Sequence, residues 1–186
     1  MNNEFFGEKL RLARLMAGIT QQELGELVAV SRQFIHQLEA GVKPPAEDLL
    51  LALAEVLKVK SDFFFKKPQN DVKYEQCHFR KRKTTPVGLA NRVLALGTIF
   101  ELLVEIIEDH LELPVANFID FEESDLCAEA IERAAEQCRI NWGLGLDAPV
   151  TNMVRVLENN GAVITCFDGV SDKVDALSMN RKRPII

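Results

Sequence analysis

One stretch, residues 20–41, constrains the fold of this chain more than any other. Thr20 followed by Glu23 has the spacing of a capping box, which predicts that a helix begins there. Ser31 is suited to cap a second helix, and Gly41 supplies a residue for the positive φ at which helices often end. Apolar residues recur at helical spacing in both halves, at Leu24, Leu27, Val28, Phe34, Ile35 and Leu38. The pattern predicts two short helices joined by a tight turn at residues 29–30.

The second predicted helix has a polar outer face. Arg32, Gln33, His36 and Gln37 occupy it, and each side chain can form hydrogen bonds. In a DNA major groove, Arg pairs with guanine O6 and N7, and Gln pairs with adenine N6 and N7, each contact discriminating by about 1–3 kcal/mol. The alternative is a solvated helix face in a protein-binding domain. His36 is suited equally to a phosphate contact or to solvent.

The string Q-x-E-L…S-x-x-x-I-x-x-L-E-x-G in this stretch resembles the helix-turn-helix of the phage repressor and Cro family, also called the XRE family. The resemblance implies that helix 31–39 lies in the major groove of double-stranded DNA and that the protein is a homodimer on paired half-sites. The turn position that is often glycine in the family is Ala29 here, so either an alanine is left-handed or the turn differs slightly. Gln21, at a helix N-terminus, is positioned for a phosphate. The predicted DNA-binding residues are Gln21, Ser31, Arg32, Gln33, His36, Gln37 and Lys43.

Residues 1–65 are expected to form a complete small helix-turn-helix domain of five helices. The first helix is predicted over residues 4–17, with Lys9, Arg11 and Arg14 as outer basic residues and Gly18 at its end. A fourth helix, residues 46–57, follows a loop stiffened by two prolines, and a last short helix starting at Ser61 delivers three phenylalanines.

The net charge of −6 conceals a strong asymmetry along the chain. Residues 1–65 carry 7 Lys+Arg and 9 Asp+Glu, residues 66–92 carry 8 and 2, and residues 93–186 carry 7 and 17. Residues 66–85 are therefore predicted to be a basic linker, in which the run Arg80–Lys83 either follows the phosphate backbone or is simply solvated. The acidic C-terminal part is poorly suited to DNA and favours a protein partner there.

Residues 86–186 are expected to form an α+β regulatory or dimerisation domain with a small sheet, so the fold class is mainly α. Pro86 opens a long apolar helix, residues 87–111, which must be buried on several sides by its own domain or by a second copy of the chain. Its charged residues argue against a membrane span. Helices at 124–139, capped by Ser124, and at 150–159 should follow, then strands at 162–167 and 174–179 and the beginning of a third.

This second half is similar to the N-terminal half of the ImmA/IrrE metallopeptidase-like domain, which is often fused behind a repressor-type helix-turn-helix. The strings IERAAEQCRINWGLG, VLENNG, AVI and DALS…RPII carry the resemblance, over residues from about 75 to 186. In that family a helix with H-E-x-x-H follows, whose histidines bind zinc and whose glutamate acts as base. This sequence contains no H-E-x-x-H and no histidine after His110, so it is a shortened chain or a remnant kept for binding.

No catalytic residue, metal site or cofactor is therefore predicted. Cys77-His78 lacks the C-x-x-C partner typical of zinc sites, and the acidic residues 120–125 are interpreted as helix-capping groups. Four cysteines without an export signal indicate reduced thiols in the cytoplasm. The function expected is a sequence-specific, repressor-like transcriptional regulator. The alternatives are the non-catalytic portion of a metallopeptidase that cleaves a repressor, and an antitoxin- or antirepressor-type interaction module.

Overall fold

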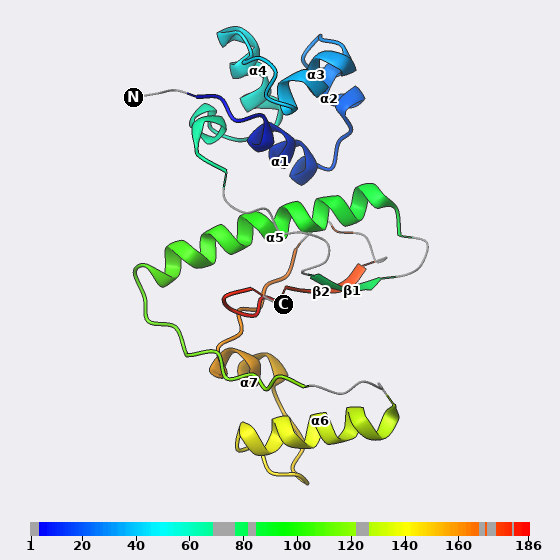
Figure 1. The fold of residues 1–186 in the computed structure, drawn as a ribbon, viewed down its shortest axis with the longest axis vertical. Helices are drawn as coiled ribbons and strands as arrows, with labels where there is room; N and C mark the ends of the chain where they lie inside the picture. Colours follow the sequence, from blue (N-terminus) through cyan, green and yellow to red (C-terminus); the bar gives the residue numbers. More distant parts are fainter. Residues whose placement is uncertain are drawn as a thin grey trace. The chain divides into compact units, whose positions relative to one another are not determined.

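The fold is mainly helical, and the described residues form one sheet of two strands, which confirms the predicted fold class (Figure 1). The computed structural model describes residues 4–68, 77–81, 85–121, 127–167, 170, 174–179 and 181–186. The chain divides into two compact units, Met1–Leu102 with Phe167–Leu177 and Leu103–Cys166 with Ser178–Ile186. The domain limits expected from the sequence, at residues 65 and 86, stay a prediction.

The first unit begins with four helices and a short 3-10 helix. They are α1 (Gly7–Ala17), α2 (Gln21–Leu27), α3 (Arg32–Glu39), α4 (Glu47–Val56) and η1 (Ser61–Phe65). The first helix starts three residues later than predicted because Phe6 is extended and its N–H donates to the carbonyl of Phe64 at 2.9 Å. It ends as predicted at Gly18, whose φ of 73° is left-handed.

Each of the five predicted helices of this part contributes residues to one hydrophobic core. The short helix η1 contributes Phe64, one of the three predicted phenylalanines, which is fully buried and whose ring centroid lies 6.0 Å from that of Phe5. Leu27 was predicted to face inward but is 61% exposed. At about 100° per residue it lies about 110° around α2 from the midpoint of the buried Leu24 and Gly25. The buried core residues are Leu10, Ala13, Leu24, Ile35, Leu38, Leu53, Ala54, Leu57 and Phe64.

Lys9 corrects the prediction of a solvated basic face on α1. The residue is buried, and its ammonium group lies 5.3 Å from the ring centroid of Phe63. A lysine can bury its aliphatic stem and place its charge over an aromatic ring, so the pattern of charges along α1 did not mark its outer face.

The long helix α5 (Val87–Glu108) ends three residues earlier than predicted. Ala90, Val93, Ala95 and Val104 are buried, whereas Leu103 and Ile106 are 48% and 57% exposed. By length and composition alone, α5 is the one described helix that could cross a membrane, a test that core helices of soluble proteins also pass.

The second unit contains α6 (Ala128–Asn141) and α7 (Met153–Asn159). The predicted start of α6 at residue 124 is wrong, because Cys127 is extended and the helix begins with the helix-forming Ala128. Ser124 itself lies outside the described residues. Helix α7 starts three residues later than predicted, where the side chain of Asn152 accepts a hydrogen bond from the backbone N–H of Arg155.

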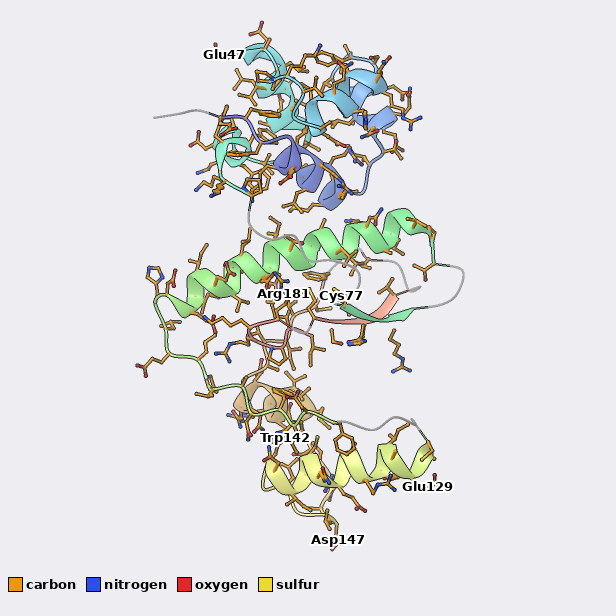
Figure 2. All side chains as sticks on the ribbon, in the orientation of Figure 1. Glu47, Cys77, Glu129, Trp142, Asp147 and Arg181 are labelled. Atoms are coloured by element: carbon orange, nitrogen blue, oxygen red, sulfur yellow. The ribbon has the colours of Figure 1, made fainter. Side chains whose placement is uncertain are left out.

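Trp142 makes two of the contacts that hold the segment before α6 within this unit. The indole N–H of Trp142, labelled in Figure 2, donates to the carbonyl of Asn117 at 2.8 Å. Its ring meets that of Phe118 edge-on, with centroids 5.6 Å apart. Residue Asp120, expected near a helix start, instead lies exposed in this irregular segment.

The sheet pairs β1 (Cys77–Lys81) with β2 (Val174–Met179), so the strand predicted at 174–179 is confirmed. Strand β1 lies within residues 66–85, which were predicted to be a basic linker, and residues 69–76 and 82–84 lie outside the described residues. The strand predicted at 162–167 is reduced to one parallel bridge between Val163 and Ile185, and Ile185 also bridges Met179.

An ion pair within the second unit joins Arg183, near the C-terminus, to Glu108 at the end of α5. Arg183 donates from Nε to a carboxylate oxygen of Glu108 at 2.8 Å, and also donates to the carbonyl of Gly161 at 2.6 Å. This hydrogen bond from Arg183 holds the pKa of the Glu108 carboxyl below its usual value.

Candidate nucleic-acid interface

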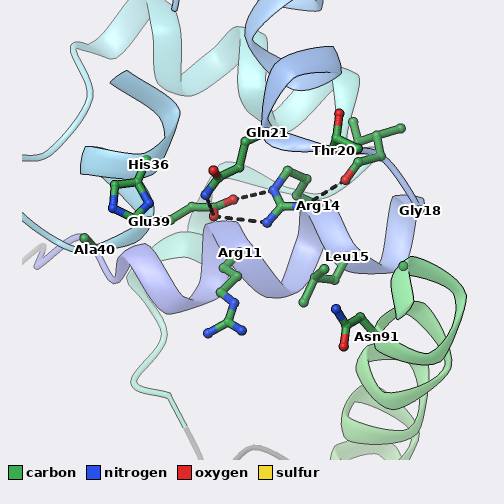
Figure 3. Close-up of a pocket in the computed structure, with 12 residues that line it drawn as sticks. Arg11, Arg14, Leu15, Gly18, Thr20, Gln21, His36, Glu39, Ala40 and Asn91 are labelled. Atoms are coloured by element: carbon green, nitrogen blue, oxygen red, sulfur yellow. Dashed lines mark hydrogen bonds and ion pairs between the residues drawn. The ribbon is translucent and has the colours of Figure 1, made fainter. Parts of the chain in front are cut away.

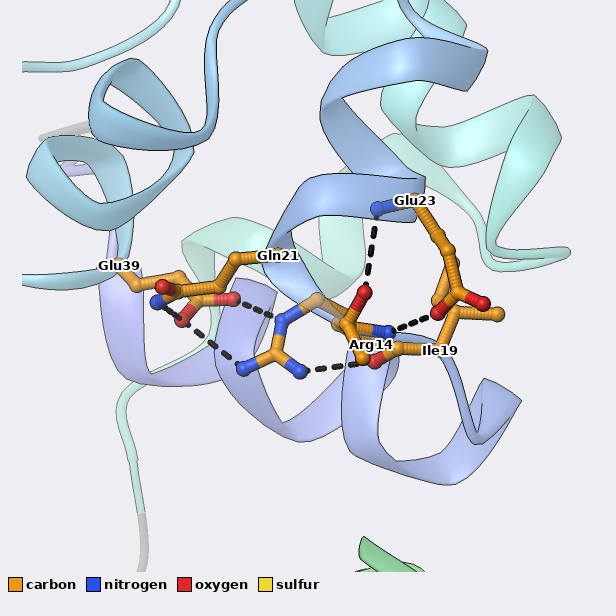
Figure 4. Close-up of polar contacts among 6 residues, drawn as sticks. Arg14, Ile19, Gln21, Glu23 and Glu39 are labelled. Carbon is orange, nitrogen blue, oxygen red and sulfur yellow. Dashed lines mark hydrogen bonds and ion pairs between the residues drawn. The ribbon is translucent and has the colours of Figure 1, made fainter.

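Helix α2 starts at a complete capping box, as the sequence predicts. The Thr20 hydroxyl accepts the N–H of Glu23 at 3.2 Å, and the Glu23 carboxylate accepts the N–H of Thr20 at 2.6 Å (Figure 4). The bond from the Thr20 backbone lowers the pKa of the Glu23 carboxyl. The two bonds satisfy donors that an isolated helix end leaves open.

The turn between α2 and α3 decides the alternative that the sequence left open at Ala29. Ala29 has a φ of 56°, so the alanine is left-handed. Gly25 lets the chain pass closely, because a Cβ there would lie 2.6 Å from the carbonyl oxygen of Val30. Ser31 then caps α3, since its hydroxyl accepts the N–H of Phe34 at 3.1 Å.

Helix α3 separates an inner from an outer face. Ile35, Leu38 and Glu39 are buried. The predicted DNA-reading side chains lie on the outer side, where Ser31, Arg32, Gln33 and His36 are exposed and Gln37 is half-buried. The structure thus brings the polar residues predicted on this helix onto one accessible surface.

A buried polar network fixes this helix to α1 and α2. Arg14 Nε lies 2.5 Å from Glu39 Oε1, and the side-chain exposures of the pair are 9% and 4%. A second Arg14 nitrogen is 3.1 Å from the other Glu39 oxygen, and a third donates to the carbonyl of Ile19 at 2.8 Å. The amide of Gln21 also donates to Glu39, at 2.7 Å (Figure 4).

This network corrects the prediction of Arg14 as an outer basic residue. It was detectable in principle, because Arg14 follows buried Leu10 by four residues and Glu39 follows buried Ile35 by four. Charges of opposite sign therefore occupy the inner faces of two helices. Gln21, which was predicted as a phosphate contact, is half-buried, and its side-chain amide donates one hydrogen bond to Glu39.

An open pocket of about 620 Å³ lies beside this network. Its lining includes Arg11, Gln21, His36 and Glu39 (Figure 3). Arg11 is exposed and was not among the predicted DNA contacts. With His36 it places cationic or hydrogen-bonding groups next to one flank of α3, an arrangement suited to an anion such as a phosphate.

Lys43 lies on the other flank of α3. Its ammonium group is 4.1 Å from the ring centroid of Phe34. At about 100° per residue, Phe34 and His36 point about 160° apart around the helix.

Of the basic run in the predicted linker, Arg80 is exposed in β1, and Arg82 and Lys83 lie outside the described residues.

The described part of the chain contains no group of three or more His, Cys, Asp or Glu side chains able to hold a metal ion. All four cysteines are thiols: Cys77 is buried, Cys138 is half-buried, and Cys127 and Cys166 are exposed.

Comparison with known proteins places the similarity in the same helices. Residues 10–64 match the family model described as "Helix-turn-helix". The chain is 35% identical over 80 residues to repressor protein C2 of Salmonella phage P22, covering 42% of this chain and 37% of that protein. It is 32% identical over 65 residues to an uncharacterized HTH-type transcriptional regulator of Sinorhizobium medicae, covering 35% and 47%. The chain thus spans less than half the length of these relatives.

Among solved structures, the crystal structure of the P22 c2 repressor with a synthetic operator is 36% identical, with a TM-score of 0.31. The match covers 31% of this chain and 88% of the repressor chain in that structure. The relatives are named as regulators and the family match spans α1 to η1. Residues 10–64 therefore match a helix-turn-helix domain, and part of the chain is similar to proteins named as a repressor and a transcriptional regulator.

Proposed function

We propose that this protein is a sequence-specific DNA-binding transcriptional regulator that reads the major groove with α3. The observation that carries the proposal is the division of α3 into a buried face and an exposed polar face. Arg32, Gln33 and Gln37 are the base readers, since Arg and Gln have the donor and acceptor patterns of guanine and adenine edges. The names of the related proteins support the same function.

The remaining predicted residues position the domain on the phosphates. Gln21 retains one amide hydrogen beyond its bond to Glu39, and His36 and Arg11 border the pocket beside it. Ser31, at the N-cap, is exposed next to the readers. Such contacts add affinity that depends on salt and carries no sequence information.

The test is binding of the 186-residue chain to DNA from its own upstream promoter, measured by fluorescence anisotropy at several salt concentrations. Because each bidentate base contact discriminates by about 1–3 kcal/mol, R32A/Q33A should weaken operator binding at least about 30-fold. The control E55A/K60A replaces exposed charged residues outside α3 and should bind like the wild type. Absence of wild-type binding, or equal binding by R32A/Q33A, would contradict the proposal.

A regulator that reads paired half-sites needs two copies, and we propose a homodimer formed through α5. Leu103 and Ile106 are three residues apart on this helix and remain about half exposed, while Val104 between them is buried. One side of the helix thus packs within the chain and another is left for a partner.

Light scattering should find a dimer for the wild type. L103E/I106E should be monomeric and should bind operator DNA more weakly, because charges on the pairing face oppose association. V115E is the matched control, since Val115 is an exposed apolar residue outside the helix. A monomeric wild type would show that α5 is not the pairing surface at these concentrations.

The acidic C-terminal region is proposed to bind a protein partner, and the protein is proposed to act in the cytoplasm.

A second candidate function is that of the non-catalytic portion of a peptidase-like protein. It is favoured by one observation: Val163 and Ile185, from two of the strings that carry that resemblance, form a bridge. Sequencing of the reading frame beyond Ile186 decides it, since a following H-E-x-x-H would support this candidate.

A further inference from the structure

We infer that Phe34 is a positioning residue that holds the ammonium group of Lys43 beside α3 as a contact to a DNA backbone phosphate. The inference rests on the proposed DNA-binding function and gives a role in binding to Phe34, which the sequence pattern predicts only as an apolar core residue. The carrying observation is the distance of 4.1 Å between Lys43 Nζ and the ring centroid of Phe34.

The ring of Phe34 is held in place by the hydrophobic core, independently of its contact with Lys43. Phe34 is half-buried and packs against the hydrophobic core that contains Ile35 and Leu38. Part of the ring is thus held by the domain, while its π-face is available to a cation. The cap bond from the Phe34 N–H to Ser31 also fixes the backbone from which the ring projects.

The loop that carries Lys43 is held as well. The N–H of Gly41 donates to Leu38 at 3.1 Å, and the N–H of Val42 donates to Gln37 at 3.0 Å. These bonds fold the chain back onto the end of α3, with Gly41 at a φ of 68°. Lys43 then precedes Pro44, which restricts the lysine backbone to extended conformations.

The position of Lys43 determines what it can contact. An α-helix with its side chains is about 10–12 Å wide. A major groove is about 12 Å wide. A group on the flank of α3 therefore faces the groove wall, which is sugar and phosphate, rather than the base edges. A flexible exposed lysine loses conformational freedom when it binds a phosphate, and a lysine already held on an aromatic ring loses less.

The stack itself is tested on the full chain without DNA. Protons on the side chain of Lys43 should show upfield ring-current shifts in the NMR spectrum, which F34L removes and F34Y retains. Unshifted Lys43 protons in the wild type would overturn the inference whether or not the protein binds DNA.

The role in binding is tested through the dependence of operator affinity on salt. K43M should reduce the slope of log Kobs against log salt by about 0.9, the value for one phosphate. F34L should weaken binding about two- to five-fold, and F34L/K43M should bind no more weakly than K43M within two-fold. F34Y should retain the wild-type slope. K60M, at an exposed lysine away from α3, is the matched control.

The outcomes separate the two proposals. If the wild type binds no DNA, the proposed function fails, and the NMR shifts still decide whether the stack exists. If the wild type binds and K43M leaves the slope unchanged, Lys43 contacts no phosphate and the inference is overturned. If K43M lowers the slope but F34L does not weaken binding, Phe34 does not position the lysine. Thermal melting of each variant checks that it is folded.

Discussion

At the scale of single residues, the pair of Arg14 and Glu39 sets the position of the proposed DNA-reading helix. Burying two charges costs desolvation energy that their attraction recovers only with good geometry and additional hydrogen bonds. Here the carboxylate receives two bonds from Arg14 and one from Gln21, while Arg14 also donates to Ile19. Three segments that are separate in sequence are thereby joined around one carboxylate.

Removing one member of this pair should be far more damaging than removing both. R14M should lower the free energy of unfolding by about 3–5 kcal/mol, because Glu39 is left buried without its partner. R14M/E39L replaces both charges by apolar groups and should recover most of that loss. Urea unfolding followed by circular dichroism measures both variants, and equal stability of R14M and the wild type would refute a structural role for the pair.

At the scale of elements, α2 depends on its ends. With seven residues it is too short to be stable alone in water. Its N-terminus is closed by the capping box, and its C-terminus passes into the left-handed Ala29. The close approach at Gly25 then sets the angle at which α3 leaves. The helix is thus defined by local bonds at one end and by a tight backbone contact at the other.

The capping box predicts a dependence on pH. Because folding lowers the pKa of Glu23, its stabilising contribution is present above the pKa of the unfolded chain and is lost as pH falls through the lower folded value. The stability difference between the wild type and E23Q should therefore be full at pH 7 and shrink below about pH 4. T20A should cost about 1 kcal/mol at pH 7. Urea titrations from pH 3 to 7 would show a constant difference if the box were irrelevant.

Elements with a local signal were predictable from the sequence. Thr20, Ser31, Gly18 and Gly41 marked helix ends because caps act through bonds within three or four residues, and the structure has all four. The outer face of α3 followed from its apolar spacing.

What the sequence did not reveal depends on distant partners. Phe6 is extended because of a bond to Phe64, and Arg14 is buried because Glu39, 25 residues away, lies opposite. The i, i+4 spacing from Leu10 and from Ile35 places Arg14 and Glu39 on inner helix faces, but no local pattern shows that the two side chains pair with each other. The start of α6 was misplaced because Ser124 offered a better cap than Cys127, the residue that precedes the helix.

At the scale of the whole molecule, the chain combines two units of different charge and content. Residues 93–186 carry 17 Asp+Glu and only 7 Lys+Arg, and the surface proposed for DNA lies in the other, less acidic part of the chain. The chain contains one tryptophan, Trp142, and it belongs to the second unit. Its emission therefore reports on that unit alone.

Unfolding should consequently not be a single transition. Circular dichroism detects both units, whereas tryptophan fluorescence detects only the unit with Trp142, so the two curves should not coincide. R14M should shift the part of the dichroism curve due to the first unit and leave the fluorescence midpoint unchanged. Superimposable curves, both displaced in R14M, would mean that the two units unfold as one.

The buried network on the inner face of α3 also has a consequence for how this protein can change. Because Ile35, Leu38 and Glu39 hold the helix from one side, the exposed residues on the other side contribute little to folding. Under the proposed function, exchange of Arg32, Gln33 and Gln37 alters the preferred operator while the scaffold stays intact. A lineage that carries such a domain can acquire a new set of target genes through a few surface substitutions, without passing through unfolded intermediates.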